Sequence, residues 1–261
     1  MKRIGIIGFG VIGSHVFRRA NEEKIFEVAF VHELDRRKTV DIDPALLLNS
    51  FDDFERRSVD LVVESAVPEV VKELGPRIVE RSDFLIFSLT SLADEDFRKE
   101  MEGLAKKAGK KIFIPHGAIL GLDGVHDGRT MLESVEITTV KNPNNLKNLG
   151  LKMNNTGEAE VIYEGPTREI CRRFPRNVNV HASVALAGLG FDKTRSKIIA
   201  DPHAKTMSHV IEVTGKGLRW KIQVESLPAG EGAITGLYTP ESAYQTVRRI
   251  CTTDEAGLRL G

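Results

Sequence analysis

A glycine-rich turn near the start of the chain constrains the fold more than any other feature. Residues 8–13 read Gly-Phe-Gly-Val-Ile-Gly, directly after an apolar run at 3–7 and directly before a helical pattern at 14–23. In such a strand–turn–helix unit the glycines permit the tight turn, the approach of a pyrophosphate and close packing of helix on strand. The sequence therefore predicts a dinucleotide site with contacts from Gly8, Phe9, Gly10, Val11, Ile12 and Gly13.

Acidic residues follow the second predicted strand, at 28–31. Glu33 lies twenty residues after the last glycine, where a carboxylate accepts hydrogen bonds from the adenosine ribose and repels a 2′-phosphate. Asp35 is the competing candidate, and the neighbouring Arg36 and Arg37 are placed to receive a 2′-phosphate. The pattern favours NAD and leaves NADP open.

Short apolar runs alternate with helical patterns through the first half of the chain. We expect strands at 61–64, 84–89 and 112–114, a helix from Pro68, and a helix that a capping box at 91–94 opens and Gly109 ends. This alternation predicts a parallel sheet covered by helices on both faces. Ala66 follows one of these strands, at the end where such sheets bind ligands, and is a further candidate cofactor contact.

The second half is richer in strands. Strands are predicted at 135–140, 160–163, 196–200, 209–213 and 218–224, and helices at 166–174, 178–189 and from Thr239 onward. We therefore predict an α/β protein with an N-terminal Rossmann-type dinucleotide-binding domain and a smaller α+β mixed-sheet domain. The first is expected at 1–118 plus a C-terminal helix at about 237–261, and the second, for catalysis and dimerisation, at 119–236.

The composition excludes several classes of partner. Lys and Arg total 37, as do Asp and Glu, so the chain lacks the basic excess that a nucleic-acid groove or an anionic membrane surface requires. No apolar run reaches the length of a membrane span. Cys171 and Cys251 form no C-x-x-C pair, so we expect free thiols, a cytoplasmic location and no metal site.

Three short segments, well separated along the chain, occur in a recognisable order. Residues 114–123 read Ile-Pro-His-Gly-Ala-Ile-Leu-Gly-Leu-Asp, residues 174–180 read Phe-Pro-Arg-Asn-Val-Asn-Val, and Ala-Asp-Pro at 200–202 precedes a histidine at 209. They resemble the P-x-G-A-x-x-G-L-D, F-P-x-N-x-N-V and A-D-P-x(6)-H segments of the L-aspartate dehydrogenases. The resemblance runs from the glycine turn to about residue 224. It implies that L-aspartate passes a hydride to NAD or NADP, which gives iminoaspartate and then oxaloacetate and ammonia, or a precursor for NAD synthesis.

The same resemblance assigns the site. It makes His209 the catalytic residue and makes Ala118 and Asn179 cofactor contacts. Without it, a histidine that alternates with Ile211 and Val213 on a strand also fits a core position. A histidine that titrates near neutrality can accept the ammonium proton or activate water, and the sequence leaves both roles open. Asn179 also fits a helix N-cap, whereas a simple turn at Ala118 is the weaker alternative.

The substrate's two carboxylates call for cations. The sequence does not rank the candidates, which are Lys141, Arg176, Lys193 and Arg195. His181 and His203 are expected to be structural or solvent-facing, and Asp201 is expected to shape the turn before the strand of His209.

The chain departs from the family pattern at two places. His116 replaces a usual serine, and residues 232–236 replace a usual N-P-K-T-S segment and keep only Thr235, which puts substrate identity more in doubt than nucleotide binding. We expect a homodimer of an L-aspartate dehydrogenase. The alternatives are a dehydrogenase for another amino acid, an imine reductase resembling dihydrodipicolinate reductase, and a non-catalytic nucleotide-sensing module.

Overall fold

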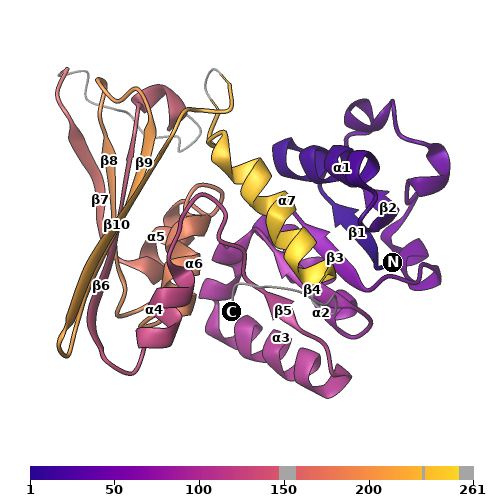
Figure 1. Ribbon diagram of the computed structural model, residues 1–261, viewed down its shortest axis with the longest axis horizontal. Helices are drawn as coiled ribbons and strands as arrows, with labels where there is room; N and C mark the ends of the chain where they lie inside the picture. Colours follow the sequence, from indigo (N-terminus) through magenta and orange to yellow (C-terminus); the bar gives the residue numbers. More distant parts are fainter. Residues whose placement is uncertain (147–156, 231–232, 253–261) are drawn as a thin grey trace. The chain divides into compact units, whose positions relative to one another are not determined.

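The computed structural model describes residues 1–146, 157–230 and 233–252. The chain divides into two compact units (Figure 1). The first comprises Met1–Phe87, Glu100–Pro115 and Pro240–Gly261, and the second comprises Ser88–Lys99 and His116–Thr239. Within the described ranges, every helix is too short or too polar to span a bilayer.

A five-stranded parallel sheet forms the centre of the first unit, in the order β2-β1-β3-β4-β5. Its strands are β1 (Arg3–Ile7), β2 (Glu27–His32), β3 (Leu61–Glu64), β4 (Asp83–Ile86) and β5 (Ile112–Phe113). The strand order reverses direction at β1, and the carboxyl ends of β1 and β3 therefore flank the crevice where sheets of this kind bind ligands. The predicted parallel sheet is confirmed.

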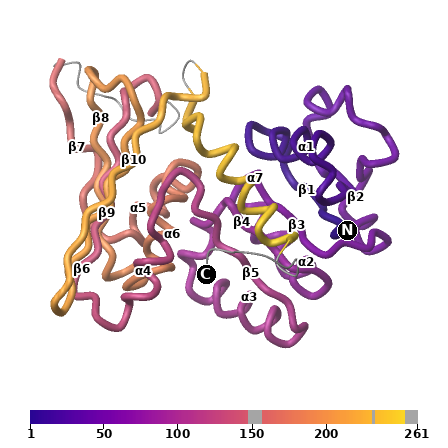
Figure 2. Tube along the Cα trace, viewed as in Figure 1, coloured from indigo at the N-terminus to yellow at the C-terminus, as the bar shows by residue number. Residues whose placement is uncertain are grey.

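Helices cover both faces of this sheet. They are α1 (Val11–Glu23), α2 (Pro68–Val79), α3 (Glu95–Ala108) and α7 (Tyr238–Cys251), with 3-10 turns η1 (Arg36–Thr39), η2 (Pro44–Leu46) and η3 (Phe51–Arg56). A further 3-10 turn, η4 (Leu89–Ala93), belongs to the second unit. Buried side chains of α1 and α7 share one apolar cluster with β1–β4, and Figure 2 shows the C-terminal helix lying beside the N-terminal elements. Neighbouring residues of a strand point to opposite faces of the sheet. On β4, Leu85 belongs to that cluster, and Phe84 therefore points to the other face, where it contacts Gly75 of α2.

The second unit is built on a mixed five-stranded sheet in the order β10-β9-β6-β8-β7. Its strands are β6 (Leu132–Lys141), β7 (Glu160–Pro166), β8 (Arg195–Ala200), β9 (Met207–Gly215) and β10 (Leu218–Ser226). β6 and β8 run parallel and the other neighbours antiparallel. The helices are α4 (Leu122–Gly128), α5 (Thr167–Arg173) and α6 (Asn179–Ala187), with a 3-10 turn η5 (Pro143–Asn145). Apolar residues of α4 and α6 pack on β6 and β9.

Some predicted boundaries are wrong. β4 ends at Ile86 rather than Leu89, and residues 89–93 form a 3-10 turn. The predicted capping box is absent, because Ser91 Oγ bonds the carbonyl of Ser88 within that turn and Asp94 accepts from the Phe97 amide at the start of α3. The short helix α4 has no counterpart among the predicted elements.

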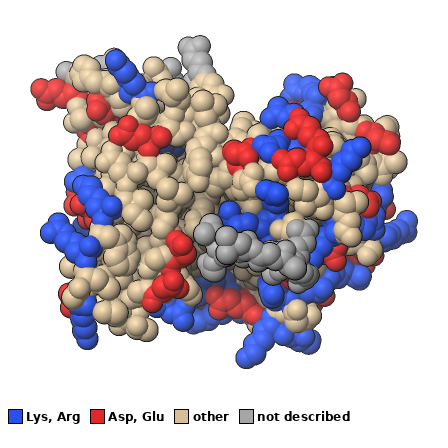
Figure 3. Space-filling model, viewed as in Figure 1, with Lys and Arg blue, Asp and Glu red and all other residues tan. Residues whose placement is uncertain are grey.

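Charges of both signs are interspersed on the face that Figure 3 shows. This distribution matches the equal totals of 37 basic and 37 acidic residues. The described residues of this face therefore create no broad field of one sign that would attract a polyanion.

Candidate active site

The glycine turn has the geometry that the fingerprint predicts. Gly8 has φ +85°, in the left-handed region that favours glycine, and its amide donates to the carbonyl of His32 at 2.9 Å. A Cβ at Gly13 would lie 2.0 Å from the Gly8 carbonyl oxygen, so only glycine lets α1 pack this closely on the turn. At Gly10 a Cβ would meet no atom within 4 Å, which leaves room beside the backbone for a ligand.

Glu33 is tied to this turn by its carboxylate. Oε2 accepts from the Phe9 amide at 2.8 Å and Oε1 from the Asp35 amide at 2.9 Å, and Lys38 Nζ lies 3.4 Å from Oε2. Burial opposes ionisation of Glu33, but the two backbone donors and Lys38 outweigh it and hold its pKa below the ordinary value. Glu33 is therefore a carboxylate held in place beside the glycine turn.

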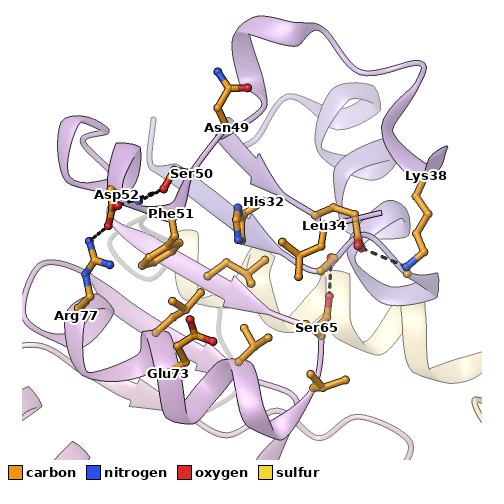
Figure 4. Close-up of a pocket in the computed structure, with 18 residues that line it drawn as sticks. His32, Leu34, Lys38, Asn49, Ser50, Phe51, Asp52, Ser65, Glu73 and Arg77 are labelled. Carbon is orange, nitrogen blue, oxygen red and sulfur yellow. Dashed lines mark hydrogen bonds and ion pairs between the residues drawn. The ribbon is translucent and has the colours of Figure 1, made fainter. Parts of the chain in front are cut away.

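A cavity of about 640 Å³ opens between the glycine turn, Glu33 and α2 (Figure 4). Of the predicted cofactor contacts, Gly8, Gly10, Glu33 and Ala66 line it. Phe9, Val11, Ile12 and Gly13 do not. The remaining lining residues are Ile7, His32, Leu34, Lys38, Asn49, Ser50, Phe51, Asp52, Ser65, Val67, Val70, Glu73, Leu74 and Arg77. The apolar walls and the carboxylate at one end fit the adenosine part of a dinucleotide.

The competing candidates near Glu33 have other partners. Asp35 accepts from the backbone amide of Arg37 and pairs with its guanidinium, and Arg36 donates to the carbonyl of Leu48. Lys38 and Arg77 are the cations among the lining residues, and Lys38, which is not among the predicted site residues, is the one beside Glu33. A lysine five residues after the acid has no recognised spacing, so the sequence carried no signal for it.

His209 lies on β9, with the same pleat orientation as Ile211 and Val213, as predicted. It is 7% exposed and pairs in register with Thr139 of β6. The Thr139 hydroxyl is 2.9 Å from His209 Nδ1 and 2.8 Å from Nε2 of His181, which lies on α6 and is 0% exposed. Of the two alternatives expected for His181, structural or solvent-facing, burial excludes the second, and the ring joins a buried polar cluster.

Lys141 completes this cluster on the same face of β6. It is 4% exposed, and its Nζ donates to the carbonyl of Ile234 at 3.0 Å. Burial lowers its pKa from 10.5 to about 8. Burial and the charge of Lys141 lower the pKa of His181 to about 3, and burial, Lys141 and His181 hold the pKa of His209 well below its ordinary value. Both imidazoles are neutral at pH 7.

The two cofactor contacts that the resemblance implied in the second unit have local roles. Asn179 is the first residue of α6 and not its N-cap, which is Val178, and its Oδ1 accepts from the Thr90 amide at 3.3 Å. Ala118 is half-buried in a turn closed by the Ile119 amide on the His116 carbonyl. Gly117 adopts φ +60° there, so the turn that we had considered the weaker alternative is present.

The other candidate cations and histidines lie on the surface. Arg176, Lys193 and Arg195 are exposed, and Arg195 lies 3.8 Å from Glu164. His203 is also exposed, and its amide donates to Asp201 Oδ1 at 2.8 Å, which confirms that Asp201 shapes the turn.

The altered segment at 232–236 contacts the buried cluster through its backbone. The carbonyl of Ile234 accepts from Lys141, and that of Ala233 accepts from Asn145 Nδ2 at 2.8 Å. Gly232 lies outside the described residues. Since carbonyl contacts do not depend on side-chain identity, loss of the usual side chains leaves both contacts intact.

Comparison with known proteins matches both halves of the chain. Residues 123–250 match the family model described as aspartate dehydrogenase, C-terminal, and residues 8–115 match that described as homoserine dehydrogenase, NAD binding domain. A crystal structure of aspartate dehydrogenase from Thermotoga maritima superposes with a TM-score of 0.79, at 29% identity and full coverage of both chains. A hyperthermophilic archaeal homoserine dehydrogenase in complex with NADPH shares the fold, with a TM-score of 0.60 at 12% identity over 99% of each chain.

Curated relatives agree over nearly the whole length. The L-aspartate dehydrogenase of Methanosarcina acetivorans is 33% identical over 98% of this chain and all of its own. That of Thermotoga maritima is 32% identical over 94% of this chain and 95% of its own. The glycine turn, the buried histidine of β9 and these full-length similarities together show that the chain belongs to the L-aspartate dehydrogenase family.

Proposed function

We propose that the chain catalyses the NAD(P)-dependent oxidative deamination of L-aspartate, with His209 as the catalytic residue. The observation that supports this most directly is the buried imidazole of His209 on β9, bonded through Nδ1 to Thr139 and near the cation of Lys141. The product would be iminoaspartate, which hydrolyses to oxaloacetate and ammonia or feeds NAD biosynthesis.

The first unit would hold the cofactor. Gly8 and Gly10 offer an open backbone and Glu33 a fixed carboxylate, while Ala66 lines the same cavity, so these residues fit a dinucleotide. The oxidised nicotinamide, when bound, would supply the acceptor for the hydride of the substrate α-carbon. Glu33 favours a free ribose hydroxyl, whereas Lys38 would attract a 2′-phosphate, so both NAD and NADP stay open. Contacts from Phe9, Val11, Ile12, Gly13, Ala118 and Asn179 remain part of the proposal.

His209 would move the proton that the reaction requires. The substrate's ammonium must lose a proton before its nitrogen can form the imine. Because burial keeps the imidazole neutral at pH 7, His209 has a lone pair that can accept this proton or deprotonate the attacking water. Thr139 occupies Nδ1, so Nε2 is the nitrogen that we assign to the substrate.

Lys141 is the cation that we assign to a substrate carboxylate. Of the four candidates it alone is buried, and it shares the polar face of β6 with the Thr139–His209 pair. A desolvated ammonium binds a carboxylate more strongly than an exposed one does. We expect it to fix the orientation of the α-carbon relative to His209.

Replacement of His209 by alanine tests the proposal. The dissociation constant of the reduced cofactor, measured by its fluorescence, should stay within about twofold of the wild-type value. The turnover of L-aspartate should fall about 10²-fold or more. His203→Ala removes an exposed histidine and is the matched control, with activity expected to be unchanged. His209→Gln keeps a polar side chain if alanine prevents folding. Full activity in a folded His209 variant would refute the assignment.

We also propose a homodimer formed through the second unit. Figure 1 shows α4 and α6 on one face of the sheet of the second unit. The opposite face carries Val140, Ile199 and Val210, which are partly exposed on adjacent strands. Such an apolar strip fits burial against a second copy. Sedimentation equilibrium over a range of concentrations tests this, and a monomer at every concentration would refute it.

A cytoplasmic location is proposed from the buried free thiols Cys171 and Cys251.

A further inference from the structure

A continuous chain of hydrogen bonds connects His209 to a second histidine. His209 Nδ1 lies 2.9 Å from Thr139 Oγ1, which lies 2.8 Å from His181 Nε2. The three side chains come from β9, β6 and α6, and their exposed fractions are 7%, 3% and 0%. Both contacts lie within hydrogen-bond range and far from solvent, so each needs one donor and one acceptor.

The threonine hydroxyl has a single hydrogen, and this couples the two rings. If His209 donates from Nδ1, then the Thr139 hydroxyl must donate to a bare Nε2 of His181. If His181 donates from Nε2, then Thr139 donates to a bare Nδ1 of His209. A neutral imidazole carries one N–H. The two histidines are therefore both protonated on Nδ1 or both on Nε2.

Only one of these arrangements makes His209 a base toward the substrate. With its hydrogen on Nδ1, His209 presents a lone pair at Nε2, and both hydrogen bonds run away from it toward His181. Uptake of a proton at Nε2 then strengthens the bond from Nδ1 to Thr139, which is polarised in turn by His181. In the other arrangement His209 presents an N–H and cannot accept a proton at Nε2.

We propose that Thr139 and His181 are positioning residues that set the tautomer of the catalytic His209, so that its base form exists only while His181 accepts the Thr139 hydroxyl hydrogen. This inference rests on the proposed role of His209. The surroundings of these three side chains fit the inference, because the pKa of His181 falls to about 3 and its ring stays a neutral acceptor. Among the described residues, Lys141 is the cation whose charge acts on both rings, and its repulsion also disfavours a charged His181.

The far nitrogen of His181 ties the ring to neither arrangement. Nδ1 is buried and has no hydrogen-bond partner among the described residues. It carries a hydrogen in the base form and a lone pair in the other form. A buried donor without an acceptor and a buried acceptor without a donor are both unfavourable, so this nitrogen locks neither arrangement and both stay within reach of the catalytic cycle.

The test combines kinetics with the state of the rings. Thr139→Val removes the hydroxyl at equal volume, and Thr139→Ser restores it without the methyl group. We expect kcat for L-aspartate to fall about 10- to 100-fold in Thr139→Val, with KM little changed, and to recover in Thr139→Ser. The acidic limb of the kcat–pH profile should move to lower pH in Thr139→Val, because protonated His209 loses the acceptor of its Nδ1 hydrogen.

Nitrogen NMR of the imidazoles provides the structural readout. In the wild type, His209 and His181 should carry the same tautomer, and in His181→Phe the Thr139 hydroxyl should hold His209 in the Nε2–H form. Opposite tautomers in the wild type, or wild-type kcat and pH profile in Thr139→Val, would overturn the inference. His209→Ala assayed in parallel distinguishes failure of the positioning role from failure of the proposed catalytic role. If His209→Ala is inactive while the Thr139 and His181 variants match the wild type, only the positioning role is refuted.

Discussion

Replacement of Lys141 by methionine is expected to stabilise the folded protein while it removes the binding of a dicarboxylate. Lys141 is 4% exposed and burial lowers the pKa of its ammonium group from 10.5 to about 8. Since a tenfold change in an ionisation constant corresponds to about 1.4 kcal/mol, the charged lysine destabilises the fold by about 3 kcal/mol at pH 7. Methionine leaves the Ile234 carbonyl without its donor, which costs about 1 kcal/mol. The net gain should be about 2 kcal/mol.

The gain should depend on pH with a definite sign. Between pH 8 and 10.5 the unfolded chain holds the lysine proton and the folded chain releases it, so wild-type stability rises with pH in this window relative to the variant. The advantage of Lys141→Met should therefore be full at pH 7 and near zero by about pH 9.5.

Urea unfolding at these two pH values measures the effect. Trp220 is the only tryptophan and packs on the apolar cluster of the second unit, so its fluorescence reports this unit. Lys193→Met, at an exposed lysine, is the matched control and should change stability by less than about 0.5 kcal/mol. Succinate, which has the two carboxylates without the amine, should protect the wild type and not Lys141→Met. A variant less stable than the wild type at pH 7, or an equal difference at both pH values, would refute the reasoning.

Two further predictions concern the first unit. Glu33→Ala should raise the use of NADP relative to NAD in steady-state assays, whereas Asp35→Ala, whose carboxylate pairs with Arg37, should not; an unchanged ratio in Glu33→Ala would mean that Glu33 does not face the ribose. Gly13→Ala places a Cβ 2.0 Å from a backbone oxygen and should lower the melting temperature by several degrees, since overpacking of this kind costs about 1–3 kcal/mol. Gly10→Ala meets no atom, so it should keep that stability and weaken the titrated binding of reduced cofactor; equal melting of both variants would contradict this contrast.

The elements that the sequence predicts well are those whose signal is local. β1 and β3 have the predicted bounds, because each is a short apolar run between turn residues. The glycine turn is recognised from its spacing together with the strand before it and the helix after it, and Gly8 and Gly13 each meet a local demand of the backbone that only glycine satisfies. The predictions fail where a longer-range contact decides. Thr90 bonds the Pro175 carbonyl and the Asn179 side chain, and residues 89–93 turn instead of extending β4.

The polar cluster around His209 could be predicted only in part. The alternation of His209 with Ile211 and Val213 indicates its buried face, and the family segment singles it out. Its neighbours depend on strand register. Thr139 lies 70 residues away in sequence and His181 lies on a helix above the sheet, so no local pattern links the three. Lys141 was one of four equal candidates until burial distinguished it.

The arrangement of the sheet of the second unit explains why a costly polar cluster can persist. Along β6, Val135 and Ile137 precede Thr139 and Lys141 on the buried face, and along β9 Val213 and Ile211 lie opposite the first pair while His209 lies opposite Thr139. Register therefore gathers apolar side chains at one end and polar side chains at the other. Because the apolar end packs against α4 and α6, it stabilises the sheet independently of the polar end. Burial at the polar end then depresses the pKa values of His209 and Lys141, and no ion pair with another described residue cancels the effect, which leaves both groups ready to respond to a dicarboxylate.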